Sequence, residues 1–449
     1  MGFHNIEQQS FSYELGRIHA TFMHKFIFYK KIVVTGLENI PENEAVILVG
    51  NHQNALMDAM AIICTRRWQP VFLARADIFQ NPIVAKLLMA IKILPVYRIR
   101  DGKESLQKNE EIFKKNVEIL KNKKFFCLMP EASHEGVRRL RTIQKGVSRI
   151  AFQAEEESDF KLGLKIVPVG IYYSNYYTFR SILQVNYGKP IEIKDLLETF
   201  KTNPNQAHNE VRKRIAEGIS EQIIDIQNEK YYQTYENLRE IYDLNMIRKT
   251  GKSKVIQADK FIADKKMISM LDEFDKYNPA EMEELNSKVT EYAENVKKQN
   301  IRDWVVEKKK SWATLLLQFL FMLLSFPIFL FGVVNNIIPF KIPKLLTRKM
   351  KDPNFHTSVE FGLFTYLFPI FYIIIFALLW IFSHSILFSL AYIIIVPFTG
   401  IFAFHYWIWA VKIFAKLRYY LKYNTSEMKN LRNLRSEIIS KMDIITQKG

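Results

Sequence analysis

The stretch AVILVGNHQNALMD, residues 45–58, holds the pattern that decides the fold. An unbroken apolar run, typical of a buried strand, ends at Gly50, a polar turn follows, and an apolar helical segment begins near Leu56. This order of strand, turn and helix is typical of an α/β domain. It leaves His52 just beyond the strand, where such domains collect functional side chains.

His52 and Asp58 form the first candidate catalytic pair. A carboxylate can accept one ring N–H of a histidine, which leaves the other nitrogen to take a proton from a hydroxyl. A histidine near an aspartate is more often structural when nothing else supports it. The pair therefore needs support from the rest of the chain.

Further out along the chain, short strand-like runs alternate with helical stretches. This alternation over residues 31–195 predicts a mixed, largely parallel sheet flanked by helices. The expected strands are residues 32–35, 45–49, 70–73, 125–128, 165–169 and 185–187. The expected helices are residues 56–64, 81–93, 105–121 and 146–155.

A second polar group follows another predicted strand, in FFCLMPEASH at residues 125–134. Glu131 stands at the end of that strand. A carboxylate beside clustered guanidinium groups suits a polyol phosphate, because it accepts a hydroxyl while the arginines bind phosphate oxygens. Without the carboxylate, the basic residues would indicate only a solvated basic face. These basic residues are Arg138, Arg139, Arg141 and Lys145.

Two more segments complete the pattern. LPVYRIRD, residues 94–101, places Arg98 and Arg100 on one side of an extended segment. IVPVGI, residues 166–171, is a strand that contains Pro168, which indicates an edge or a bend near a site.

In this order the four segments resemble the signature blocks of the glycerol-phosphate and lysophospholipid acyltransferase superfamily, over about residues 30–195. The resemblance implies an α/β domain with His52 as general base and Asp58 as its orienting partner. It also implies that Arg98 and Glu131 bind substrate. Lys145 matches a lysine that is common after the third block.

The chain departs from the family pattern at three points. Five residues rather than four separate His52 from Asp58, so the extra residue is expected in the turn before the helix. Ala132 replaces a glycine of the third block, and His134 replaces an arginine. His134 remains a substrate-binding candidate, but the phosphate contact is then expected from Arg138, Arg139 or Arg141.

The resemblance implies acyl transfer without a metal or cofactor. The expected donor is acyl-CoA or acyl-carrier protein, and the expected acceptor is 1-acylglycerol 3-phosphate or glycerol 3-phosphate. Two alternatives stay open. One is an O-acyltransferase for another lipid or polar alcohol, for example an amino-acid lipid, and the other is a non-enzymatic membrane scaffold with the same fold.

The composition favours a membrane protein. A formal charge of +17 suits either nucleic acid or an anionic membrane surface. Long apolar segments decide for the membrane, so we expect no nucleic-acid partner. Cys64 and Cys127 are far apart and provide neither a disulfide framework nor metal-ligand spacing. The first ten residues do not resemble a secretory signal.

The expected domains follow from these composition changes. Residues 1–30 predict an amphipathic helix that either lies on the bilayer or packs on its own domain. Residues 31–195 are the predicted catalytic domain. The remaining expected regions are a charged helical module at 196–310, a membrane region at 311–411 and a basic cytoplasmic tail at 412–449.

The membrane region contains three apolar segments, residues 312–340, 361–382 and 386–410, each long enough to cross a bilayer. Basic residues flank all of them, so we expect the catalytic domain, the loop at 341–351 and the tail on the cytoplasmic face, in a bacterial inner membrane. The last two segments predict a hairpin. The first is either a single crossing or, as favoured here, a re-entrant segment that bends at Pro327.

Overall fold

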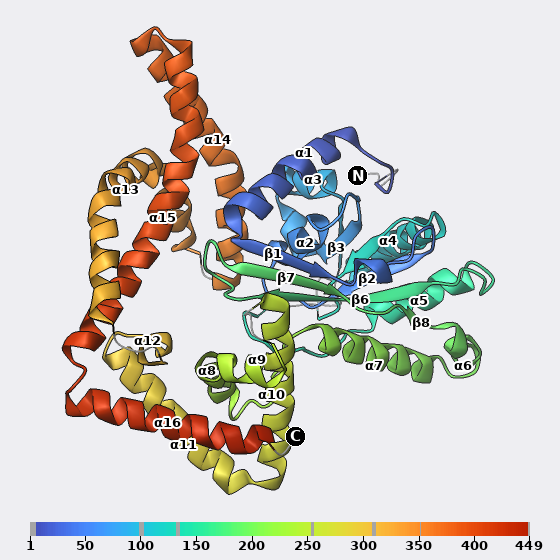
Figure 1. Cartoon of the computed structure of the whole chain (residues 1–449). Coiled ribbons are helices and arrows are strands. Elements are labelled where there is room, and N and C mark those ends of the chain that lie inside the picture. The colour runs from blue at the N-terminus through green and yellow to red at the C-terminus, as the bar shows by residue number, and fades with distance from the viewer. Residues whose placement is uncertain are drawn as a thin grey trace. The chain divides into compact units, whose positions relative to one another are not determined.

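The computed structural model describes residues 6–97, 103–131, 135–252, 256–307, 311–350 and 352–447. The predicted site residues Arg98 and His134 lie outside these described residues. The chain divides into two compact units (Figure 1). Unit 1 comprises Met1–Asp225 and Thr347–Thr365, and unit 2 comprises Ile226–Leu346 and Tyr366–Gly449.

Unit 1 is built on an eight-stranded sheet in the order β1-β7-β6-β2-β5-β3-β4, with β8 paired to β6. All the pairings are parallel except those of β6 with β7 and with β8. The predicted mixed, largely parallel sheet is therefore confirmed. The strands are β1 (Lys31–Thr35), β2 (Val46–Gly50), β3 (Val71–Arg75), β4 (Ile93–Val96), β5 (Phe126–Leu128), β6 (Lys165–Tyr173), β7 (Ile182–Tyr187) and β8 (Ile191–Glu192).

Strand β2 lies at the centre of the arrangement that positions the site. It pairs in parallel with β5 on one side, where Leu48 faces Cys127, and with β6 on the other, where Leu48 faces Val167. Parallel neighbours present their carboxyl ends at one edge of a sheet. The residues that follow β2 and β5 therefore meet near the end of β6.

Helices cover both faces of this sheet (Figure 1). Ile47 and Val49 of β2 share a buried core with α4, α5 and α7. Gly50 points to the other face of the sheet, where a Cβ would lie 3.6 Å from Ile62. Helix α2 therefore packs on that face. The helices of unit 1 are α1 (Phe11–Phe22), a π-helical turn (Met23–Phe28), α2 (Leu56–Ile63), α3 (Pro82–Ala90), α4 (Lys103–Lys121), α5 (Gly146–Glu156), α6 (Leu197–Thr202) and α7 (Pro204–Gln222).

Unit 1 extends to Asp225, beyond residue 195 where the predicted catalytic domain was expected to end. The reason is α7, whose apolar residues Val211, Ile215 and Ile219 are completely buried in the core of the sheet domain. The spacing of these residues indicated one buried helix face, but it could not show which domain would cover that face. Long-range packing decides this point.

Helix α1 leaves an apolar stripe uncovered. Tyr13 and Met23 pack inward, whereas the side chains on the opposite face keep more than half of their surface exposed. The exposed residues are Phe11, Leu15, Ile18, Phe22 and Phe26. Of the two expectations for this segment, the exposed stripe favours a helix that lies on a bilayer over one that packs only on its own domain.

Unit 2 combines a charged helical module with three long apolar helices. Its short and charged helices are α8 (Tyr232–Ile241), α9 (Asp243–Lys249), α10 (Gln257–Tyr277), α11 (Pro279–Lys298), α12 (Asp303–Glu307) and α16 (Ser426–Gln447). Helix α16, from the expected tail, packs on α10 and α11. Arg435 of α16 also forms a two-pronged ion pair with Asp303 of α12, with N–O distances of 2.8 and 3.0 Å.

The apolar helices are α13 (Trp312–Thr347), α14 (His356–Ser383) and α15 (Ile386–Leu421), and all three are long and apolar enough to cross a membrane. His384 and Ser385 separate α14 from α15, as the predicted hairpin requires. The first residues of α14 belong to unit 1. There Thr357 donates a hydrogen bond to the Tyr176 carbonyl (3.0 Å), and Phe361 packs on Phe28.

The predicted bend of α13 at Pro327 is wrong, because α13 keeps the same antiparallel course along α15 before and after that residue. The direction of α13 changes later. Gln318 contacts Lys416 and Gly332 lies against Thr399, as in an antiparallel pair with α15. Phe340 then returns to Phe404, with ring centroids 6.0 Å apart, so the helix curves back near Pro339 (Figure 1).

Two asparagines hold this curve within unit 2. Asn336 donates to the Val396 carbonyl (3.2 Å) and accepts from the Tyr372 hydroxyl (2.6 Å). Asn335 accepts from the hydroxyl of Tyr392. Polar side chains within apolar helices find partners on neighbouring helices in this way, and here they tie α13 to both α14 and α15.

Candidate active site

The turn between β2 and α2 positions His52. Gly50 ends β2, and α2 begins at Leu56 after Ala55, which has φ 43° and ψ −126°. An alanine rarely adopts this backbone conformation, which costs about 1–3 kcal/mol and is found mainly at functional sites. The turn before α2 therefore accommodates the one residue by which the spacing of His52 and Asp58 exceeds the family pattern, as expected.

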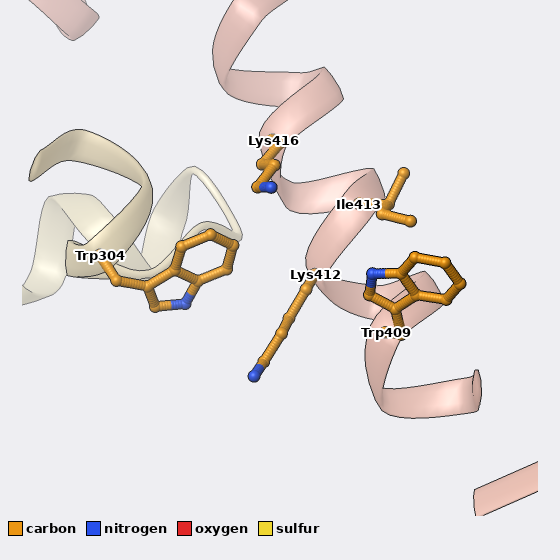
Figure 2. A pocket seen from close by; sticks show the side chains of 5 residues that line it. All are labelled: Trp304, Trp409, Lys412, Ile413 and Lys416. Atoms are coloured by element: carbon orange, nitrogen blue, oxygen red, sulfur yellow. The ribbon is translucent and has the colours of Figure 1, made fainter. Parts of the chain in front are cut away.

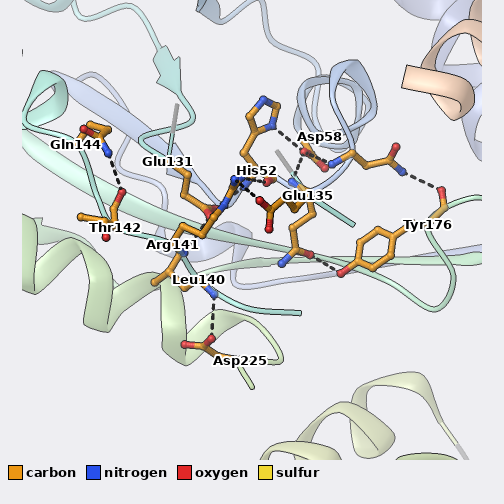
Figure 3. A network of polar contacts seen from close by, with 12 residues as sticks. His52, Asp58, Glu131, Glu135, Leu140, Arg141, Thr142, Gln144, Tyr176 and Asp225 are labelled. Atoms are coloured by element: carbon orange, nitrogen blue, oxygen red, sulfur yellow. Dashed lines mark hydrogen bonds and ion pairs between the residues drawn. The ribbon is translucent and has the colours of Figure 1, made fainter. Parts of the chain in front are cut away.

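His52 and Asp58 are in direct contact. The His52 Nδ1 atom lies 2.9 Å from Asp58 Oδ2, so the predicted contact between the two side chains is present. The Asp58 side chain is completely buried, whereas a fifth of the His52 side chain is exposed. The histidine is therefore accessible while its partner is shielded from water. Figure 3 shows the contact between the two side chains.

The Asp58 carboxylate accepts hydrogen bonds from several further donors. The backbone N–H groups of Gln53 and Asn54 each donate to Oδ2 at 2.8 Å. The hydroxyl of Tyr173, at the end of β6, donates to Oδ1 at 2.8 Å. With donors on every side of the carboxylate, the fitting tautomer of His52 has Nδ1–H donating and the lone pair on Nε2.

Glu131 ties the end of β5 to this turn. Its Oε1 accepts from the His52 backbone N–H (2.7 Å), and its Oε2 accepts from the backbone N–H (3.0 Å) and Nε (3.2 Å) of Arg141. Burial raises the pKa of Glu131 by more than the hydrogen bonds from His52 and Arg141 lower it. Glu131 therefore supports the backbone of His52, and its contact with substrate stays a prediction.

Several supporting residues escaped the sequence analysis. The Asn51 side chain exchanges two hydrogen bonds with the backbone of Ile171, at 2.7 and 3.0 Å. The Tyr176 hydroxyl donates to Gln53 Oε1 at 2.6 Å. Together with Tyr173, these contacts hold the turn against β6. The only hint in the sequence was the tyrosine-rich run that follows Ile171.

The predicted cationic residues differ in their placement. Arg141 contacts His52 directly, donating from Nη2 to the His52 carbonyl (3.3 Å) (Figure 3). Arg138 is buried, with its guanidinium 5.0 and 5.1 Å from the ring centres of Tyr172 and Tyr176. Arg139 is half-buried, and Lys145 is exposed at the start of α5.

Loop residues 135–144 are also held to α7. The Leu140 backbone N–H donates to Asp225 Oδ1 at 2.9 Å, and Ser220 donates to Asp225 Oδ2 at 2.9 Å. The cationic loop is therefore fixed to the end of the catalytic unit. Within the part of the chain that the structure describes, no group of three or more histidine, cysteine, aspartate or glutamate side chains could hold a metal ion.

Comparison with known proteins points to one family. Residues 31–172 match the family model described as Acyltransferase. The 1-acyl-sn-glycerol-3-phosphate acyltransferase of Borreliella burgdorferi is 27% identical over 181 residues, which cover 40% of this chain and 66% of the relative. The chain thus spans about two thirds of the length of this curated relative.

A solved structure is also similar to part of this chain. The crystal structure of the 1-acyl-sn-glycerophosphate (LPA) acyltransferase PlsC from Thermotoga maritima is 22% identical and covers 47% of this chain and 78% of that chain. Its TM-score is 0.33, which is too low to support an argument about the fold.

The contacts of Glu131 predict a stability effect. Glu131→Gln places an amide N–H₂ opposite groups that are themselves donors, so the free energy of unfolding should fall by about 1–3 kcal/mol. Thermal unfolding of the purified full chain measures this loss. The matched control is Glu135→Gln, because Glu135 is exposed and only approaches Arg141 at 3.6 Å. Equal midpoints for both variants would contradict the supporting role of Glu131.

Proposed function

We propose that the protein transfers a fatty acyl group from a thioester to a lipid-precursor hydroxyl, with His52 as general base. The match of residues 31–172 to the Acyltransferase family model and the similarity to a 1-acyl-sn-glycerol-3-phosphate acyltransferase support this proposal. The observation that carries this proposal is the 2.9 Å contact between His52 Nδ1 and the buried Asp58 carboxylate. This contact orients the ring and keeps the lone pair on Nε2, the atom that must take the proton.

The reaction balances with the groups of this site and its two substrates. His52 Nε2 removes the proton of the acceptor hydroxyl, and the oxygen attacks the thioester carbonyl. The ester C–O bond forms, the C–S bond breaks, and the departing thiolate takes the proton back from His52. Asp58 stabilises the positive charge on the ring between these two proton transfers.

We propose 1-acylglycerol 3-phosphate or glycerol 3-phosphate as the acceptor and acyl-CoA or acyl-carrier protein as the donor. The relative from Borreliella burgdorferi, whose name states the first of these acceptors, supports that choice. Arg98 and Arg141 are our candidates for the acceptor phosphate. Arg141 is chosen from loop 135–144 because its guanidinium donates to the His52 carbonyl.

The second candidate function is acyl transfer to an acceptor without a phosphate monoester. Arg138 packs between tyrosine rings, and His134 stands where the family has an arginine. Both features reduce the number of guanidinium groups available for a phosphate. They favour a lipid or polar alcohol that carries less negative charge than a phosphate monoester.

We also propose that the catalytic unit, the loop before α14 and helix α16 all face the cytoplasm. All three candidate spans lie after residue 311, and Thr347–Thr365 belongs to the catalytic unit. Helix α13 would therefore begin and end on one side, as its curve near Pro339 permits. Helices α14 and α15 would cross and return, because α16 packs on α10 and α11.

Replacing His52 tests the mechanism. We expect His52→Ala to lower acyl transfer by about a hundredfold or more, the usual scale for the loss of a general base. Turnover of a labelled thioester by the purified protein measures this effect. His208→Ala is the matched control, since His208 of α7 binds Ser148 and takes no part in the site. A folded His52→Ala protein with wild-type turnover would rule out the mechanism.

Replacing the arginines tests the acceptor. A charge-assisted contact contributes about 1.5–3 kcal/mol, so Arg98→Ala and Arg141→Ala should each raise the KM for 1-acylglycerol 3-phosphate by about tenfold or more. The KM for monoacylglycerol, which lacks the phosphate, should stay unchanged in the same variants. Equal effects on both acceptors would indicate structural damage, and no effect on either would favour the non-phosphorylated acceptor.

Cysteine labelling tests the topology. A single cysteine introduced at Lys349 should react with an impermeant maleimide only after the cells are opened, because the loop before α14 is proposed to face the cytoplasm. Burial raises the pKa of the Cys64 thiol to about 12 and also raises the pKa of the Cys127 thiol, so the wild-type chain should stay unlabelled and serves as the control. Labelling of Lys349→Cys in intact cells would refute a re-entrant α13.

A further inference from the structure

A cavity of about 330 Å³ in unit 2 lies between α12 and α15. Two tryptophans, two lysines and one isoleucine line it: Trp304, Trp409, Lys412, Ile413 and Lys416. Its size falls within the range of small-ligand pockets, about 300–1,000 Å³. It shares no residue with the site around His52.

The polar groups of this cavity can only donate hydrogen bonds. Lysine ammonium and indole N–H groups have no acceptor atom, and the described residues that line the cavity include no carboxylate. Figure 2 shows Lys412 and Lys416 leaving α15 toward the side of Trp304. The cavity is therefore built for a ligand that accepts hydrogen bonds and carries negative charge, such as a phosphate ester.

One of the two lysines is held in place. Lys416 Nζ donates to Gln318 Oε1 of α13 at 2.9 Å and lies 5.7 Å from the centre of the Trp304 ring. Lys412 is exposed, and its extended side chain leaves α15 on the side that faces Trp304 (Figure 2). A fixed and an extended ammonium group can thus approach one anion from two directions.

The position of the cavity along α15 indicates that the ligand is a lipid. Lys412 is the first cation after the apolar run that ends at Ala410, so it stands where the helix would leave hydrocarbon for the headgroups. An aromatic pair lies beside it, with the ring of Trp409, three residues before Lys412, 4.9 Å from that of Phe321. Ile413 is fully buried and forms an apolar wall beside the two charges.

We propose that this cavity binds the headgroup phosphate of an acidic glycerophospholipid. Lys412 and Lys416 bind the phosphate oxygens, and the tryptophans pack against the glycerol backbone at the edge of the hydrocarbon. The lipid binds here as a ligand and is not transformed. It links the charged helical module to the acidic membrane surface at the end of α15.

Lipid binding to the full chain tests the proposal without any turnover. The purified protein in detergent is titrated with phosphatidylglycerol, and bound lipid is counted by native mass spectrometry. Phosphatidylglycerol is chosen because it is neither the proposed acceptor nor its product. We expect Lys412→Gln to weaken this binding by about tenfold, the effect of losing one charge-assisted contact.

The matched control is Lys429→Gln, which removes the same charge from an exposed position on α16. It should leave phosphatidylglycerol binding unchanged, and both variants should unfold at the wild-type temperature. Equal binding by the wild type and Lys412→Gln, or equal losses in the two variants, would overturn the proposal. Equal affinity for phosphatidylcholine would also overturn it, and displacement of the lipid by millimolar inorganic phosphate would assign the cavity to a soluble anion.

Discussion

The arrangement of the catalytic unit depends on one buried carboxylate. Asp58 accepts hydrogen bonds from the His52 ring, from two backbone N–H groups of the turn and from the Tyr173 hydroxyl. A buried acceptor is costly to leave unsatisfied, so these donors are drawn to fixed positions. The single carboxylate thereby joins the end of β2, the start of α2 and the end of β6.

Glu131 repeats the same principle from the neighbouring strand. It is buried like Asp58 and binds the backbone of His52 rather than its ring. His52 is therefore held at its backbone by β5 and at its side chain by α2. Such support from two directions would keep His52 oriented, as its proposed role as general base requires.

Periodicity and residue spacing in the sequence predicted much of this structure, and the predictions that failed share one cause. The strand runs, the hairpin at residues 384–385 and the contact of His52 with Asp58 all follow from short-range periodicity and spacing. The extent of the catalytic unit and the curve of α13 do not. Pro327 removes a donor, yet α13 continues through it, and the direction changes where Asn336 finds partners on α14 and α15.

By itself the sequence determined the strand ends that bear His52 and Glu131, the family pattern around them and the three apolar segments, because each rests on residues close together in the chain. Only the tertiary structure decided that β5, β2 and β6 are neighbours, that Tyr173 donates to Asp58, and that Glu131 supports a backbone. Sheet order and the partners of buried polar groups depend on contacts between residues that lie 79 to 119 positions apart in the chain. No local pattern encodes such contacts, since burial and the need to satisfy every polar group select them together.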